Sequence, residues 1–300
     1  MNITIHTTVS FNSILYLNYL YENYTHLSSK KTKIFFNLNC LDNMSYYYFK
    51  FDKRFNLVNK LGFERGSLGH ALSLNQAIKD FDKKNLNIIS DVDIVIVRKN
   101  WDILIQNFFL KNSKLGVIGV SYENIDGFST GASKLQTYKN QPTATWMVLS
   151  PKFNFSELSF LPQKDSFLNV NSKKLSNIYK LPIGFSVLKD VGWEIPMFLY
   201  KKKIQYKTLE IIKPVSKKSK VLFGLSQYHD EFHLNSIPFL VHQRGSMKHN
   251  FRIDQLSRDF YNACDKYLGF PFWSVKPKSY NYILNFILKL IKKIKKIYIF

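Results

Sequence analysis

The chain has 300 residues, enough for one large domain or two ordinary ones, and for a core that needs no disulfide staples. Hydrophobic residues make up 45% and charged residues 21% of it, which excludes wholesale disorder. The only cysteines, Cys40 and Cys264, exclude a disulfide framework and a four-cysteine zinc site and favour a reduced, cytosolic setting. The net charge of +22, from 43 Lys and Arg against 21 Asp and Glu, indicates an anionic partner: nucleic acid, a phosphorylated ligand or an acidic membrane.

The positive charge is concentrated in two segments. Residues 201–220 hold eight lysines and a single acid, Glu210, and residues 279–300 hold five lysines and no acid. These two segments carry 12 of the 22 surplus charges, so the rest of the chain is only mildly basic. Solvated lysine faces explain the segment 201–220 as well as a binding role does. The charge is therefore not that of a uniformly basic nucleic-acid binder.

The hydrophobic pattern of the first 120 residues alternates between strands and helices. The chain opens without a basic stretch followed by a long apolar run, so we expect no cleavable signal peptide, and we expect no spanning helix. Strands are predicted at Ile3–Val9, Lys33–Cys40, Phe55–Leu61, Leu86–Ile89, Ile94–Val97 and Leu115–Val120, and helices at Asn12–Leu27, Leu68–Phe81 and Trp101–Leu110. This alternation predicts a parallel, doubly wound α/β sheet, which binds ligands at the carboxyl ends of its strands.

The second half of the chain is less regular. We predict strands at Ala144–Leu149, Lys220–Phe223 and Phe239–His242, and helices at Val191–Lys202 and Ile253–Tyr267. No Pro, Gly or Ser-rich linker divides the body, so residues 1–270 are predicted to form one catalytic domain and residues 271–300 a separate tail.

A pair of carboxylates follows the predicted strand at residues 86–89. Asp91 and Asp93 are two residues apart, and in an extended chain such residues project to the same side. Two clustered carboxylates repel each other unless a cation lies between them, and a hard divalent ion such as Mg²⁺ or Mn²⁺ would suit these oxygen ligands. By spacing alone, a strand-ending turn with two solvated aspartates is the favoured explanation, because a motif of three residues is short.

The surroundings of this pair resemble glycosyltransferases with the GT-A fold, and the family-2-like members most closely. The Asp-Val-Asp segment lies between apolar stretches, as their DxD segment does, and residues 66–77 (GSLGHALSLNQA) are similar to the helix that precedes it. Two later segments, DVGWE at 190–194 and FLVHQRGS at 239–246, resemble elements found towards the end of their catalytic domain. The resemblance implies a GT-A, Rossmann-like, mostly parallel sheet with flanking helices.

The resemblance also implies roles for individual residues. Asp93 would bind the Mn²⁺ or Mg²⁺ ion directly, Asp91 would bind the ion or the ribose of a nucleoside-diphosphate sugar, and His242 would complete the metal site. A satisfied strand-end histidine is the alternative for His242, and His249 is its competitor. The remaining positions expected to contact the donor are Thr7, Asn39, His70, Asn75 and Arg244.

An inverting transfer needs a carboxylate to accept the proton of the acceptor hydroxyl. Asp190 is the first candidate because it opens the acceptor-side segment, and Glu194 is the second. Both would also serve as acids at the start of a helix, where capping and the helix dipole favour them. Inversion and retention of configuration both stay open.

The tail after residue 280 has the pattern of a basic amphipathic helix. Lys289, Lys292, Lys293 and Lys296 share one helical face, and isoleucine and leucine residues fill the other. Such a helix lies in a membrane interface, or else packs on its own domain. We therefore expect a cytoplasmic protein held peripherally at the inner face of a membrane.

Three other functions compete with a metal-dependent glycosyltransferase acting on a glycan or lipid-linked acceptor. A nucleotidyltransferase would open with a Gly-rich, basic loop after the first strand, where this chain has TTVSFNS. A nucleic-acid-binding protein would explain the charge but not the aspartate pair, and no nucleic-acid-binding motif occurs. A catalytically inactive protein of the same fold would look identical in sequence.

Overall fold

The computed structural model describes residues 1–10, 13–60, 66–121, 135–136, 141–163, 166–226, 229–243 and 255–272. Its helices are α1 (Ile14–Leu27), α2 (Asn43–Phe49), α3 (Gly66–Lys79), α4 (Trp101–Lys111), α5 (Lys173–Tyr179), α6 (Ile195–Lys201) and α7 (Gln255–Leu268). Its strands are β1 (Ile3–Val9), β2 (Ile34–Cys40), β3 (Asn56–Lys60), β4 (Leu86–Ser90), β5 (Ile94–Ile96), β6 (Leu115–Gly119), β7 (Leu135–Gln136), β8 (Trp146–Leu149), β9 (Phe167–Asn169), β10 (Ser186–Leu188), β11 (Gln205–Thr208), β12 (Glu210–Ile212), β13 (His229–Leu234) and β14 (Ile237–Gln243).

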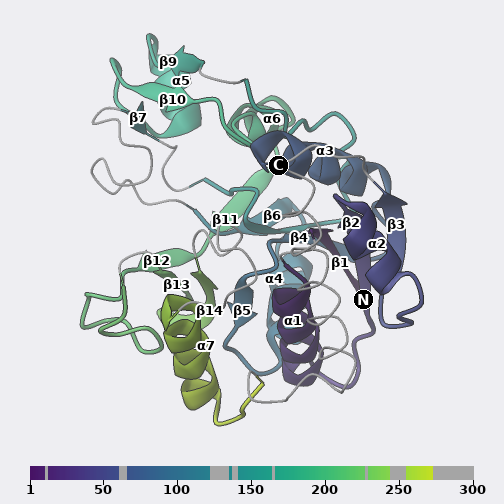
Figure 1. The fold of residues 1–300 in the computed structure, drawn as a ribbon. Helices are drawn as coiled ribbons and strands as arrows, with labels where there is room; N and C mark the ends of the chain where they lie inside the picture. Colours follow the sequence, from purple (N-terminus) through teal and green to yellow (C-terminus); the bar gives the residue numbers. More distant parts are fainter. Residues whose placement is uncertain are drawn as a thin grey trace, which may run out of the picture.

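A seven-stranded sheet in the order β11-β6-β8-β4-β1-β2-β3 forms the centre of the molecule (Figure 1). Strands β3, β2, β1 and β4 are parallel neighbours, as are β6 and β11, whereas β8 runs antiparallel to both β4 and β6. The expected mostly parallel α/β sheet with flanking helices is confirmed. The sheet is not purely parallel, because the chain enters β8 at the end of the sheet where the neighbouring strands β4 and β6 finish.

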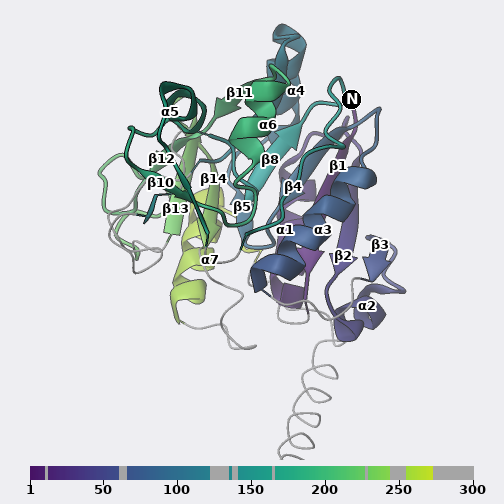
Figure 2. The same cartoon turned by 90° about the horizontal axis from the view of Figure 1, so that it is seen from above.

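Helices cover both faces of this sheet, because the strands bury both of their sides. In β8, Trp146 and Val148 belong to the larger core and Met147 and Leu149 to a second core on the opposite face. Helices α1, α4 and α7 contribute to the larger core, while α3 and α6 contribute to the second. Figure 1 shows these two layers on either side of the sheet, and Figure 2, seen from above, shows α3 and α6 in front of it.

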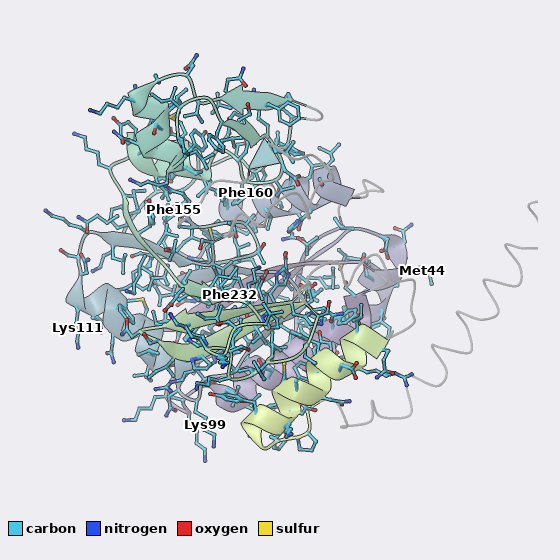
Figure 3. All side chains as sticks on the ribbon, turned by 90° about the vertical axis from the view of Figure 1, so that its left-hand side faces the viewer. Met44, Lys99, Lys111, Phe155, Phe160 and Phe232 are labelled. Carbon is cyan, nitrogen blue, oxygen red and sulfur yellow. The ribbon has the colours of Figure 1, made fainter. Side chains whose placement is uncertain are left out.

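The side chains follow this layering. Phe232, on β13, lies in the larger core, while Phe155 and Phe160 lie in the second core (Figure 3). Lys99 and Lys111, at the two ends of α4, are exposed at the periphery. The folded body thus has two cores separated by one sheet, with charged side chains outside them.

Two smaller sheets accompany the central one. Strands β12, β13, β14 and β5 form an antiparallel sheet, in which β5 pairs with β14. Since β5 begins four residues after β4 ends, it connects this sheet to the central one. Strands β7, β10 and β9 form the other, which packs with α5 around Val170, Tyr179 and Val187. In the part of the chain that the structure describes, no helix is both long and apolar enough to cross a membrane.

Most elements predicted in the first half are confirmed, with boundaries shifted by one or two residues. The predicted strand at Lys220–Phe223 is wrong. The three backbone N–H groups of residues 220–222 donate to the buried carboxylate of Glu231, so they cannot pair with a neighbouring strand.

Two helices differ from the prediction. The helix predicted from Val191 begins only at Ile195, after a turn. Helix α2 was not expected, because its run of tyrosines favours a strand; Asp42 caps it by accepting from the Ser45 N–H at 2.7 Å. The tail helix lies outside the described residues.

A buried histidine on β1 gives the fold a testable pH dependence. The ring of His6 is enclosed between Phe81 and the Asn87 side chain, whose Oδ1 lies 3.1 Å from His6 Nε2. Burial lowers the pKa of His6 to about 4, and the contacts with Asn87 and Asp80 only partly offset this. Between pH 7 and pH 5, His6 therefore becomes protonated in the unfolded chain but stays neutral in the folded chain. As a result, His6 lowers the free energy of unfolding as the pH falls.

The expected size of this effect is about 2 kcal/mol of unfolding free energy lost between pH 7 and pH 5. In urea denaturation, His6→Gln should lose that much less stability than the wild type over the same range. The exposed His26 provides the control, since His26→Gln should keep the wild-type slope. An unaltered slope in the His6 variant would contradict the assignment.

Candidate functional site

The two aspartates of the predicted pair lie on a turn that joins the central sheet to the antiparallel sheet. Residues 91–93 turn between β4 and β5, rather than continuing extended as the sequence suggested. The Asp91 N–H donates to Thr145 O at 2.9 Å, and the Gln243 N–H donates to Asp93 O at 3.2 Å. The turn is thereby fixed to the start of β8 on one side and to the end of β14 on the other.

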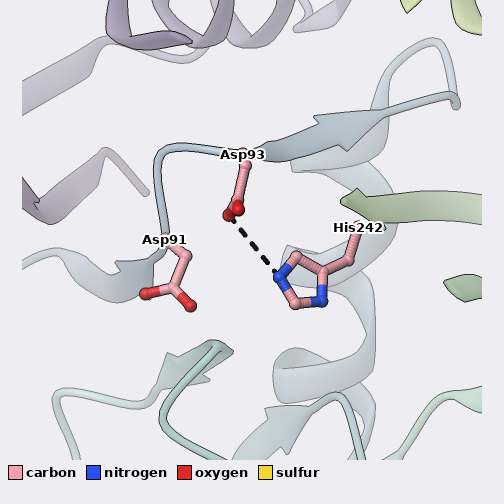
Figure 4. Close-up of side chains that lie close together, drawn as sticks. All are labelled: Asp91, Asp93 and His242. Carbon is pink, nitrogen blue, oxygen red and sulfur yellow. Dashed lines mark ion pairs between the residues drawn. The ribbon is translucent and has the colours of Figure 1, made fainter. Parts of the chain in front are cut away.

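His242 meets this turn because β14 pairs with β5. In the antiparallel register, His242 lies opposite Ile94, next to Asp93, and its Nε2 is 3.5 Å from Asp93 Oδ1 (Figure 4). Ligand atoms of Asp91, Asp93 and His242 all lie within 4.8 Å of one another. The structure thus brings together the three residues that the sequence proposed as metal ligands.

The spacing and chemistry of these three groups fit a divalent ion. Two donors about 2.1 Å from a shared ion lie between roughly 3 and 4 Å apart, so the observed cluster needs only small side-chain adjustments. Two carboxylate oxygens with an imidazole nitrogen suit Mn²⁺ and also accept Mg²⁺. Asp93 and His242 are buried and Asp91 is partly exposed, which leaves one open side to the cluster.

Each aspartate also faces a histidine. His70, on the first turns of α3, places its Nε2 3.2 Å from Asp91 Oδ1. Burial is the largest influence on the pKa of both His70 and His242 and lowers it, but the nearby carboxylates, led by Asp91 for His70 and by Asp93 for His242, together leave both pKa values above the ordinary one. The negative charge gathered here accounts for both shifts, and this charge is what a bound cation would neutralise.

An ion pair next to His242 was missed by the sequence analysis. Asp230 lies directly across the β13–β14 ladder from His242, is fully buried, and has its Oδ1 2.5 Å from Lys213 Nζ. Asp230 also contributes to the raised pKa of His242. The sequence signal was the run of polar and charged residues in HDEFHL, all of which the structure buries on β13. Assigning Asp230 to the site from this run would have required knowing that β13 pairs with β14.

The expected nucleotide contacts on β1 and β2 lie at the carboxyl ends of these strands. Thr7 and Asn39 are each 1% exposed, and neither Thr7 Oγ1 nor Asn39 Oδ1 has a hydrogen-bond partner among the described residues. They point to opposite faces, since Thr7 shares the side of Ile5 and Asn39 is paired with Thr8. A buried polar atom without a partner is costly, so each of these atoms is suited to a ligand.

Other expected site residues have different surroundings. Asn75 Oδ1 accepts from the Phe160 N–H at 2.9 Å, which ties α3 to the loop before β9. Asp190 is exposed, its Oδ1 accepts from the Val191 N–H, and its charge acts on His70. Glu194 precedes α6, and its charge acts on Tyr179 rather than on the aspartate–histidine cluster. Arg244, like His249, lies outside the described residues.

The comparisons with known proteins concern the fold. No protein-family model matches the sequence, and no curated protein matches it. Among solved structures, the chain is similar to residues 1–349 of S. aureus TarS in complex with UDP-GlcNAc, with 16% identity and a TM-score of 0.35 over 70% of this chain and 59% of that one. It is also similar to the glycosyltransferase GlyE of Streptococcus pneumoniae TIGR4 (10% identity, TM-score 0.41, 89% and 62% covered) and to mouse xyloside xylosyltransferase 1 (8%, 0.38, 70% and 86%).

The chain spans less than two thirds of the matched TarS and GlyE chains. At these identities and TM-scores the likeness concerns the arrangement of the fold, and no residue role follows from it. The structures to which the chain is similar thus include a glycosyltransferase and a xylosyltransferase.

Proposed function

We propose that this protein is a metal-dependent glycosyltransferase of the hexosyltransferase type, which moves a sugar from a nucleoside-diphosphate sugar to a glycan or lipid-linked acceptor. The convergence of Asp91, Asp93 and His242 at the carboxyl end of β4 carries this proposal. Ligand sites of open α/β sheets lie at that end of the strands, and a compact group of two carboxylates and an imidazole suits a divalent ion. Polysaccharide synthesis is the process into which such a reaction would fit.

The surrounding residues supply the other requirements of a donor site. Asn39 Oδ1 and Thr7 Oγ1 are buried atoms without a partner among the described residues, at the ends of two neighbouring strands. Because they point to opposite faces of the sheet, a base or ribose would satisfy one of them, and Asn39, on the face of Thr8 and α3, is the one on the side of His70. A bound Mn²⁺ or Mg²⁺ ion would neutralise the diphosphate and stabilise it as a leaving group. His70, in contact with Asp91, would hold this carboxylate in place at the open side of the cluster.

The proton of the acceptor hydroxyl needs a base in an inverting transfer. Of the two candidates, Asp190 is favoured, because its charge acts on His70 and so reaches the cluster, whereas that of Glu194 acts on Tyr179. Asp190 is also exposed, so an acceptor can approach it. We therefore propose Asp190 as the base.

The location of the enzyme is part of the proposal. The lysine stripe at residues 289–296, with apolar residues opposite it, supports attachment of the tail to an anionic membrane surface. Lipid-linked acceptors are held at such surfaces. We propose a cytoplasmic enzyme that is peripheral at the inner face of the membrane.

A panel of nucleotide sugars tests the activity. Thermal shift with UDP-, GDP- and dTDP-sugars, with and without Mn²⁺, should give one class whose stabilisation depends on the metal, and a CMP-sugar, which has no diphosphate, should give none. Slow hydrolysis of that donor should release a nucleoside diphosphate and the free sugar. Release of pyrophosphate from a nucleoside triphosphate and a sugar phosphate would instead indicate a nucleotidyltransferase. Stabilisation by oligonucleotides alone would indicate a nucleic-acid-binding protein.

A further inference from the structure

The connection between β12 and β13 combines exposed lysines with exposed apolar side chains. We call residues 213–226 the basic loop. No acid occurs from residue 211 to residue 229, and Lys217, Lys218 and Lys220 are all exposed. Two apolar side chains of the loop are also exposed, Val215 at 73% and Phe223 at 60%. Nothing in the described body covers them.

Hydrogen bonds hold the basic loop in one shape. The Gly224 N–H donates to Pro214 O at 3.0 Å, which joins the two ends of the loop. Because Val215 follows Pro214 and Phe223 precedes Gly224, this bond brings the two exposed apolar residues onto neighbouring stretches of chain. Both exposed residues therefore lie where the two ends of the loop meet.

The buried Glu231 on β13 anchors the middle of the loop. Its carboxylate accepts from Ser219 Oγ at 2.6 Å and from three successive backbone N–H groups, those of Lys220, Val221 and Leu222, at 2.9–3.1 Å. The side chains of Val221 and Leu222 are buried beneath the loop. Because Val221 and Leu222 fill the space beneath the loop, the side chain of the next residue, Phe223, remains at the surface.

We propose that the basic loop docks on an anionic lipid bilayer, with Phe223 and Val215 entering the interface and Lys217, Lys218 and Lys220 among the headgroups. Apolar side chains set between lysines match an interface that is apolar inside and negatively charged outside. Recognition of single-stranded nucleic acid uses a groove with successive aromatic side chains on which bases stack, whereas this loop has a single aromatic side chain, Phe223, beside the aliphatic Val215. This proposal is independent of the sugar-transfer activity and of the tail.

The position of the loop relates docking to the candidate site. Lys213, at the start of the loop, forms the ion pair with Asp230, and Asp230 lies across the ladder from His242. A bilayer bound at the loop would therefore lie on the side of the molecule where the antiparallel sheet carries His242. An acceptor held in that bilayer would be brought near the site.

A fluorescent probe at the loop tests the contact directly. Both native cysteines are buried, so Phe223→Cys in the full chain can be labelled with an environment-sensitive dye such as NBD. Mixing with phosphatidylcholine vesicles containing 30% phosphatidylglycerol should shift its emission to the blue and raise its intensity, and pure phosphatidylcholine should not. Phe51→Cys is the matched control, since Phe51 is 84% exposed beside Lys50 on another part of the surface, and its signal should not change.

Vesicle co-sedimentation adds a measurement without the dye. Replacing Lys217, Lys218 and Lys220 together by glutamine should lower the partition coefficient by about fivefold per lysine at low salt. Phe223→Ser should lower it as well, and Phe51→Ser should not. Residues 273–300 are present in every variant, so any contribution from them cancels in the comparison. Equal binding by all variants, an unresponsive probe at position 223, or a response to single-stranded DNA in place of anionic vesicles would overturn the proposal.

Discussion

Replacing Asp93 by alanine should weaken metal-dependent binding of a nucleoside diphosphate by about a hundredfold or more. Asp93 is buried and lies 3.5 Å from His242, so its carboxylate is the innermost oxygen ligand of the candidate site. Its loss would remove one negative charge and one donor from a cluster that has only three ligand groups in the described chain. Isothermal titration calorimetry with Mn²⁺, using the nucleotide found in the donor screen, measures the effect.

Two controls distinguish this result from a folding defect. Glu157→Ala removes a carboxylate that is 67% exposed and paired with Lys202 at the surface, and it should leave binding unchanged. Titration without metal should give equally weak nucleotide binding for the wild type and the Asp93 variant, because Asp93 contributes to nucleotide binding only through the bound ion. Unchanged Mn²⁺-dependent affinity in Asp93→Ala would remove the central claim about this site.

Asp190→Asn should leave donor binding intact and lower turnover by about a hundredfold or more, the usual contribution of a positioned base. The amide keeps an oxygen that can accept from the Val191 N–H, so the turn before α6 should keep its shape. What is lost is the capacity to accept a proton. Steady-state kinetics with donor and acceptor varied separately should show a fall in kcat with little change in the donor KM.

Glu194→Gln is the matched variant for this prediction. Glu194 lies four residues further on, is only partly exposed and makes no side-chain cap to α6, so its replacement should not disturb the helix. It should retain most of the wild-type kcat. The opposite result, with full activity in the Asp190 variant and loss in the Glu194 variant, would move the role of base to Glu194. Full activity in both would indicate a retaining mechanism.

The sequence predicted the local features of this protein well, because they depend on neighbours in the chain. The alternation of apolar residues predicted β1, β2, β4 and β6, and the helical spacing predicted α1, α3 and α4. The position of Asp91 and Asp93 at the end of a buried strand was likewise readable from the sequence. The mostly parallel class of the sheet followed from the alternation of strands and helices.

Only the tertiary structure decided how distant strands pair. β8 lies antiparallel to its neighbours in the central sheet, and β5, which follows β4 in the chain, pairs with β14 in the smaller antiparallel sheet. In the sequence, both strands look like ordinary buried segments. The pairing of β5 with β14 brings His242 beside Asp93, and that of β13 with β14 adds Asp230 and its partner Lys213. Register between strands is set by long-range burial, which local periodicity does not encode.

The segment at residues 220–223 is a case in which a long-range contact prevented a strand that the sequence predicted. Its apolar letters fit a strand, and the sequence contains no local reason to reject one. The buried carboxylate of Glu231, on a strand that follows later in the chain, takes the N–H groups that a ladder would need. A backbone donor can serve only one strong acceptor, so the segment became an anchored loop that leaves Phe223 exposed at the surface. The sequence by itself determined the lysine and apolar composition of this loop, and the tertiary contact with Glu231 determined its conformation.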